Sequence, residues 1–133
     1  MPNSLAMRIS RELLPFVRTP GQYIGGEVNQ LVRPGDWEQA DVRVVIGFPD
    51  AYTIGMSHLG CQILYWLCNE TAGVCAERTY APWLDAEAIM RAKGMPLFTW
   101  DTRQSVGDAD IFAISLQYEL CFTTLLNMLD LAG

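Results

Sequence analysis

The sequence has 133 residues, of which 50% are hydrophobic and 18% are charged, a composition typical of one folded domain rather than a disordered chain. Its net charge is -6 and its nine Lys and Arg residues are spread along the chain, which argues against DNA as a partner. The apolar runs 63–68 and 111–116 are too short to cross a bilayer, and the first residues lack a secretory pattern. We therefore expect no membrane partner and a cytoplasmic location.

The first 40 residues are expected to form a helix followed by an arm rich in Gly and Pro. Apolar residues recur at three- and four-residue steps over 5–17, which predicts the helix. Turn signals between 19 and 36 flank two short pieces that we predict to be extended, 22–24 and 28–32. The segment 1–40 is either a strap laid over a sheet or a surface that docks on another part of a longer protein.

The segment 41–133 alternates between strand and helix patterns. A β-branched run predicts a first strand that ends at Pro49, and further strands are predicted at 74–80, 96–100 (a short edge strand) and 111–116. Helices are predicted from residue 59 to about 69, over 84–93 and over 118–132. The run 111–116 is typical of a strand buried on both faces of a sheet. The first of these helices is predicted to pack on the sheet through an apolar stripe formed by Leu59, Ile63, Leu64 and Leu67.

This alternation predicts an α/β fold, a Rossmann-like or flavodoxin-like arrangement of three layers around a parallel sheet. Right-handed crossovers place the first strand between the other two, giving the core strand order 2-1-3. Such domains commonly have five strands, so we expect 41–133 to be an incomplete domain from a longer chain. With this order, residues 50–58 and 115–119 meet at the carboxyl ends of the strands, where open α/β sheets bind ligands.

Each polar or turn-forming residue near this edge allows two interpretations. Asp50 either closes a turn or bonds a ligand, and Gly55 supplies a positive φ angle. Ser57 caps the next helix or, with the helix start, holds a phosphate or amide group. His58 is by default a surface or interface residue, with a metal ligand as the other interpretation, and Ser115 bonds either a backbone group or a ligand. No paired carboxylate or nucleophile with a base can be assembled, so no catalytic residue is predicted.

The four cysteines, at 61, 68, 75 and 121, include no closely spaced pair. Structural zinc and iron–sulfur sites normally show such pairs. We interpret these cysteines as buried apolar thiols in a reducing compartment, and we predict no metal ligands in this chain.

The pattern Asp50-x-Tyr52-x-x-Gly55 follows the first strand and resembles the DxHxxG loop of cobalamin-binding Rossmann-like domains. Tyr52 stands where that family has its cobalt-ligating His. Ser115 matches a second family element, although Gln117 replaces the Leu of the usual SxL, and a third element, Gly-Gly, would lie beyond the last residue. The resemblance implies a corrinoid, base-off cobalamin, bound without a protein His ligand. The cofactor-binding residues that we infer from it and from the loop are Asp50, Tyr52, Gly55, Ser57, His58, Ser115 and Gln117.

Several sequence blocks resemble the N-terminal region of radical S-adenosylmethionine (SAM) proteins that carry a cobalamin-binding-like domain in front. The most specific blocks are 55–60 and 115–119, and 20–27 and 81–83 also match. In that family a downstream barrel holds a [4Fe-4S] cluster on a CxxxCxxC loop and binds SAM. The cysteines here lack this spacing, so the resemblance implies that this piece does not itself perform radical chemistry.

The resemblance leaves two functions open. In the first, the chain binds a corrinoid for a radical SAM enzyme on the same polypeptide. In the second, the Rossmann-like fold is retained without the ligand, and the chain is a structural or interaction module whose partner is its own downstream radical SAM domain.

Overall fold

A computed structural model describes residues 4–133, and the first three residues of the predicted segment 1–40 lie outside the described residues. The predicted first helix is present and is capped by Ser4, whose side chain accepts a hydrogen bond from the Met7 N–H. Helix α1 (Leu5–Arg8) continues into a π-helical segment (Ile9–Leu13) and a 3₁₀ turn (Leu14–Phe16). The π-helical segment buries its first and last side chains in the core.

The arm is more helical than the sequence predicts. The piece 22–24 is not extended, because Pro20–Tyr23 forms a 3₁₀ turn, and 28–32 forms no strand. A short helix α2 (Asp36–Gln39) follows. Tyr23, Val32 and Trp37 are buried in the same core as the sheet residues, so the arm is a strap tied to the core by apolar side chains. A domain boundary at residue 40 stays a prediction.

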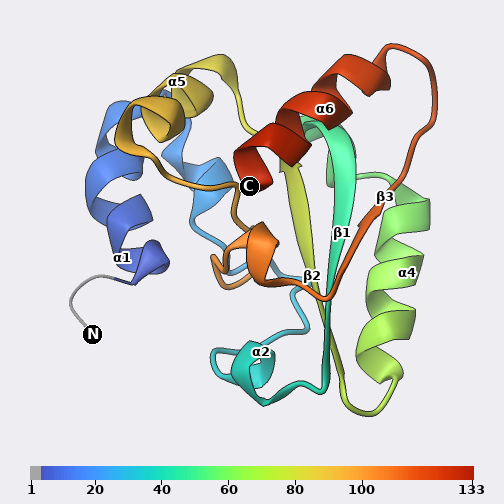
Figure 1. Cartoon of the computed structure of the whole chain (residues 1–133). Helices are drawn as coiled ribbons and strands as arrows, with labels where there is room; N and C mark the ends of the chain where they lie inside the picture. The colour runs from blue at the N-terminus through green and yellow to red at the C-terminus, as the bar shows by residue number, and fades with distance from the viewer. Residues whose placement is uncertain (1–3) are drawn as a thin grey trace.

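Three parallel strands form the sheet: β1 (Val42–Ala51), β2 (Val74–Ala81) and β3 (Ile111–Ile114). Their order is β2-β1-β3, with β1 in the centre (Figure 1). The predicted α/β class, parallel pairing and strand order are therefore confirmed. The segment 96–100 is not a strand, since it contributes only one antiparallel bridge, between Phe98 and Ser105.

Helices cover both faces of the sheet. Helix α4 (Leu59–Glu70) packs against β2 and β1, and α6 (Cys121–Ala132) packs against β1 on the other side, next to α5 (Leu84–Lys93) (Figure 1). The three layers are those of a doubly wound domain. Among residues 4–133, no helix is both long enough and apolar enough to span a membrane.

The buried face of α4 is not the predicted one. Leu59, Ile63, Leu64 and Leu67 are exposed, and Cys61 and Tyr65 point into the core instead. Tyr65 tolerates this position because its hydroxyl is fully used there, accepting the Leu31 N–H and donating to Asp101. The prediction for β3 is also wrong: this strand lies at the edge of the sheet and Ile111 is 51% exposed.

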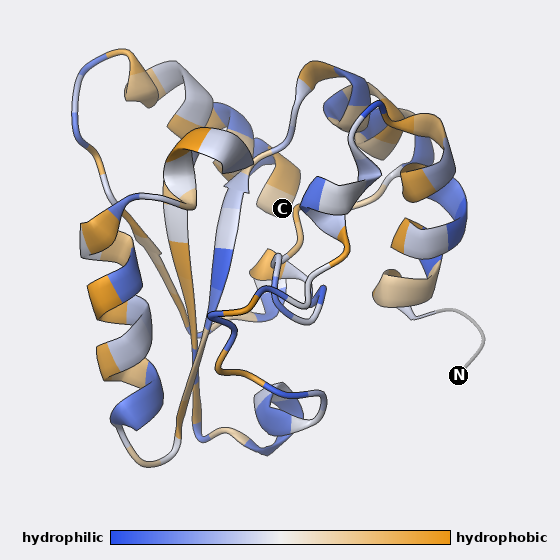
Figure 2. Cartoon of the chain, turned by 180° about the vertical axis from the view of Figure 1, so that it is seen from behind, coloured by the Kyte–Doolittle hydropathy of each residue, from blue (hydrophilic) through white to orange (hydrophobic). Residues whose placement is uncertain are grey.

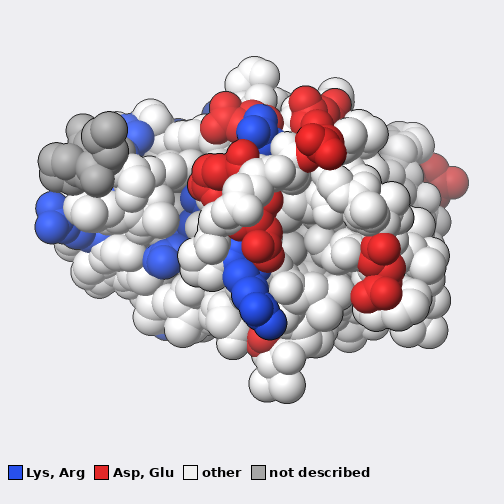
Figure 3. Space-filling model, turned by 90° about the horizontal axis from the view of Figure 1, so that it is seen from below, with Lys and Arg blue, Asp and Glu red and all other residues white. Residues whose placement is uncertain are grey.

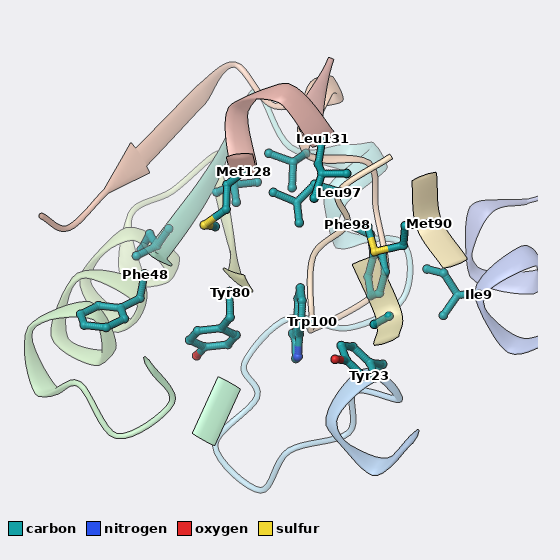
Figure 4. Close-up of a cluster of buried hydrophobic side chains, with 14 of the residues drawn as sticks. Ile9, Tyr23, Phe48, Tyr80, Met90, Leu97, Phe98, Trp100, Met128 and Leu131 are labelled. Atoms are coloured by element: carbon teal, nitrogen blue, oxygen red, sulfur yellow. The ribbon is translucent and has the colours of Figure 1, made fainter. Parts of the chain in front are cut away.

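The segment 95–101 fills the centre of the molecule without forming regular structure. Figure 4 shows the indole of Trp100 between the rings of Tyr80 and Tyr23, at centroid distances of 5.6 and 5.5 Å. Phe98 stacks on the same indole at 5.1 Å. These aromatic contacts join the strap, β2 and the 95–101 segment in one core.

A carboxylate is buried on β2, beside this segment. Glu77 is fully buried and accepts hydrogen bonds from the hydroxyls of Thr99 and Thr102 and from the Thr102 N–H. Burial raises the pKa of Glu77 above its ordinary value, and the bonds from the two threonines lower it by less.

The raised pKa of Glu77 predicts a pH-dependent stability. The proton on Glu77 contributes stability that is fully present below the unfolded pKa of 4.5 and is lost as the pH rises through the higher folded pKa. Glu77→Gln cannot titrate, so its unfolding free energy relative to that of the wild type is expected to increase as the pH rises from about 4.5 to 8. Urea unfolding at several pH values measures this difference, and a pH-independent difference would contradict the prediction.

Candidate functional site

The two segments predicted to form the site meet at the carboxyl edge of the sheet. The Ser115 N–H donates to the Gly47 carbonyl at 3.0 Å, and the Tyr118 hydroxyl donates to Asp50 Oδ2 at 3.2 Å. The convergence expected from the crossover rule is therefore confirmed. Asp50 itself lies in β1 rather than in a loop, because the strand passes through an irregularity between Phe48 and Ala51 and ends at Ala51.

Tyr52 does not lie with Asp50 at the meeting point of β1 and the 115–118 segment. It begins the one-turn helix α3 (Tyr52–Gly55), and its hydroxyl donates to the Glu27 carboxylate of the strap. The ring stands edge-on to Tyr80 at 5.7 Å. Burial, and then the bond to Glu27, raise the pKa of Tyr52 to about 12, so at neutral pH the side chain is a protonated donor, which is a poor metal ligand.

Gly55 does not have a positive φ angle, so the expected left-handed conformation is wrong. A glycine is needed here because a side chain would not fit. A Cβ atom at this buried position would lie 2.4 Å from Tyr80 Cδ1 and 3.2 Å from Phe48 Cβ. The glycine lets α3 approach the aromatic side chains of β1 and β2 closely.

The helix cap is His58, not Ser57. The Ser57 hydroxyl donates to the Ile54 carbonyl at 3.0 Å, whereas His58 Nδ1 accepts the Cys61 N–H at 3.2 Å. The imidazole also lies against Phe48, with ring centroids 4.7 Å apart. In the neutral ring Nε2 then carries the hydrogen, so neither nitrogen offers a free lone pair to a metal.

Ser115 and Gln117 form a hydrogen-bonded pair just after the end of β3. Gln117 Nε2 donates to Ser115 Oγ at 2.6 Å. Ser115 also contacts Cys61: burial raises the pKa of this thiol, and a hydrogen bond with Ser115 lowers it by less. Ser115 thereby links the end of β3 to the first turn of α4.

A groove of about 430 Å³ adjoins Asp50 on the side of α5 and α6. Asp50 is the only predicted site residue among those that line it. The polar and aromatic side chains that sequence analysis missed are Trp83, Glu87, Thr123, Thr124 and Asn127. One sequence signal was available for Trp83: it closes the family-like block 81–83, and its indole is 56% exposed.

A buried ion pair joins β2 to the segment 95–101. Arg78 Nη2 donates to Asp101 Oδ1 at 2.6 Å, and the Arg78 N–H donates to Oδ2 at 2.7 Å. The guanidinium lies 4.1 Å from the centre of the Tyr65 ring, and its Nη1 donates to Asn29 and Gln62. All of these groups are paired within the protein, which indicates a structural role.

The cysteines do not form a cluster. Cys61, Cys75 and Cys121 are buried and Cys68 is half-buried, all as free thiols, in agreement with the predicted apolar role. Within residues 4–133, no three His, Cys, Asp or Glu side chains are grouped in a way that would hold a metal ion. The residues present therefore do not fit a [4Fe-4S] cluster.

One family model matches part of the chain. The family model described as "Radical SAM proteins, N-terminal" matches residues 60–133, a range that begins in α4 and includes Ser115 and Gln117 but not Asp50 or Tyr52. No curated protein and no solved structure matches the chain. The matched range is more than half of the chain, and the chain therefore belongs to the family of radical SAM protein N-terminal regions.

Proposed function

We propose that this chain is the corrinoid-holding, non-catalytic module of a radical SAM protein, and that it supplies no ligand to the cobalt. The observation that carries the proposal is the meeting of Asp50 with the 115–118 segment at the carboxyl edge of β1 and β3. The connection from β1 leads to β2 on one side of it, and the next connection leads to β3 on the other side, so the switch point of the sheet lies between β1 and β3. Open α/β sheets bind ligands at this point.

The side chains at this edge suit amide-rich ligands better than metals. A corrinoid carries amide groups around its ring, and Asp50, Ser115 and Gln117 offer acceptors and donors for them. His58 Nδ1 already accepts the Cys61 N–H, and the Tyr52 hydroxyl is bonded to Glu27, so neither side chain is arranged as a cobalt ligand. A corrinoid at this edge would receive orientation and shielding from the chain, and its cobalt would keep solvent or its own ligands.

Radical chemistry is assigned to another part of the protein. The family relationship implies a [4Fe-4S] cluster and SAM in the whole protein, and no cluster of ligands exists among residues 4–133. The chain's contribution is then to position a second cofactor for that chemistry.

Retention of hydroxocobalamin tests the proposal. The chain, and the longer radical SAM protein that carries it, are mixed with hydroxocobalamin with and without a reductant, desalted, and examined by visible spectroscopy. We expect retention with a base-off spectrum that is the same for the wild type and for Tyr52→Phe, because Tyr52 faces the strap. Ser115→Leu is expected to reduce retention at least tenfold, by removing a polar group and adding bulk at the edge.

One observation favours a second function, that of a structural module without a ligand. The polar groups at the edge already bond one another: Tyr118 to Asp50, and Gln117 to Ser115. A colourless protein in both the short and the longer forms would support this alternative and overturn the corrinoid proposal. A histidine-ligated spectrum that is lost in His58→Ala would overturn the claim that the chain supplies no ligand.

A further inference from the structure

The outer edge of β3 has no partner strand among residues 4–133. Residues of a parallel strand alternate between the two neighbouring strands in their hydrogen bonding. The Ser115 N–H donates to the Gly47 carbonyl of β1 at 3.0 Å, so the N–H groups of Ile114 and Phe112 point to the open edge. An open edge of this kind is a template for another strand.

Apolar side chains are exposed on both sides of this edge. Neither flanking helix covers β3, because α4 packs mainly on β2 and β1, and α6 packs on β1. Figure 2 shows orange, hydrophobic residues along the outer side of α4, beside the β3 edge. The exposed residues of the edge surface are Leu59, Ile63, Trp66 and Leu67 of α4, Ile111 and Leu116 near β3, and Phe122, Leu126 and Leu129 of α6.

The spacing of these residues defines a stripe on each helix. Leu59, Ile63 and Trp66 follow one another at four and three residues, and Phe122, Leu126 and Leu129 repeat the same spacing. Stripes of this kind normally face a packing partner. Each helix therefore has one apolar side in the core and a second apolar side exposed.

The edge surface also lacks the charges that protect isolated sheet edges. No Asp, Glu, Lys or Arg occurs in 55–69, 111–118 or 120–129. In the view of Figure 3, no Lys or Arg lies on the half that carries α4, and the charged residues visible on that half are Asp and Glu. An uncharged apolar area at an open edge is typical of a surface that is covered in the assembled protein.

We propose that a further parallel strand, from the part of the radical SAM protein beyond this N-terminal region, pairs with β3 and covers the edge surface. Family membership supplies the occupant, because the chain is an N-terminal region of a larger class of protein. The geometry favours it too. The Leu131 carbonyl of α6 accepts the Leu97 N–H, and a Cβ on Gly107 would lie 2.8 Å from the Ala132 carbonyl, so α6 ends beside the turn that leads into β3. A short link from there reaches the start of a parallel neighbour of β3.

This inference does not depend on corrinoid binding, and its test has no corrinoid readout. In the radical SAM protein that carries this chain, we expect the amides of Phe112 and Ile114 to exchange with solvent at least 100-fold more slowly than an unpaired amide. We also expect Ile63→Glu and Leu126→Glu each to lower Tm by roughly 5 °C or more, because each buries a charge under the new strand. Val28→Glu, at an equally apolar but fully exposed position in the strap, is the control and should leave Tm unchanged.

The results that would overturn the proposal are distinct. Fast exchange at Phe112 and Ile114, together with Tm values for Ile63→Glu and Leu126→Glu that match the control, would show that the edge is free. A dimer that dissociates in Leu126→Glu would show that a second copy covers the edge. Light scattering of the wild type and the variant measures that state, and the proposal predicts the same mass for both.

Discussion

Asp101→Ala is expected to lower the free energy of unfolding by about 3–5 kcal/mol, the largest effect that we predict for a single substitution. Asp101 accepts bonds from the Arg78 guanidinium, the Arg78 N–H and the Tyr65 hydroxyl, and the side chains of the ion pair are 5% and 0% exposed. Alanine would leave the buried Arg78 cation without its counter-ion, and the Arg78 N–H and the Tyr65 hydroxyl without their acceptor. Chemical denaturation followed by circular dichroism measures the loss.

An exposed ion pair provides the matched control. Arg91 contacts Asp130 at 2.8 Å, and the Asp130 side chain is 68% exposed. Asp130→Ala is therefore expected to change stability by no more than about 0.5 kcal/mol. A second comparison tests whether the cost comes from the buried charge that is left behind. The double variant Arg78→Met, Asp101→Leu removes both charges, so it should be more stable than Asp101→Ala alone. Equal losses for Asp101→Ala and Asp130→Ala would contradict this account.

The strand order could be predicted because it depends on local patterns and one general rule. The β-branched run that forms β1 and the alternation that follows it define a βαβαβα chain. Right-handed crossovers then leave one arrangement, with β1 in the centre. The same rule brought Asp50 and Ser115 to one edge, so the position of the candidate site followed from the sequence.

Side-chain directions could not be predicted in the same way. Helix α4 is apolar on more than one side, so periodicity alone does not show which side faces the sheet. The side containing Tyr65 is buried because Leu31 and Asp101, both distant in sequence, satisfy its hydroxyl. Tyr52 was likewise placed at the edge by its position in the motif, but its hydroxyl reaches Glu27 in the strap. Contacts between residues 25 or more apart in the chain decide these directions, and spacing carries no information about them.

Gly55→Leu is expected to lower the free energy of unfolding by about 3 kcal/mol or more, because the site has no room for a side chain. The Cβ atom alone would overlap the Tyr80 ring, with distances of 2.4 and 2.7 Å to Cδ1 and Cε1. Relief requires α3 to move away from β2, which would also pull Tyr52 from Glu27. The higher helix propensity of leucine offsets this loss of unfolding free energy by at most about 1 kcal/mol.

Two variants separate this steric effect from other causes. Tyr52→Phe removes only the hydroxyl bonded to Glu27, at a cost of about 1 kcal/mol. Gly21→Ala adds a methyl group where no atom lies within 4 Å, and it should leave stability nearly unchanged. Thermal unfolding of the three variants therefore orders them as Gly55→Leu, Tyr52→Phe and Gly21→Ala, from least to most stable. Comparable shifts for Gly55→Leu and Tyr52→Phe would mean that α3 is loosely held, and the close approach of Gly55 to Tyr80 would then have no part in fixing the loop beside Asp50.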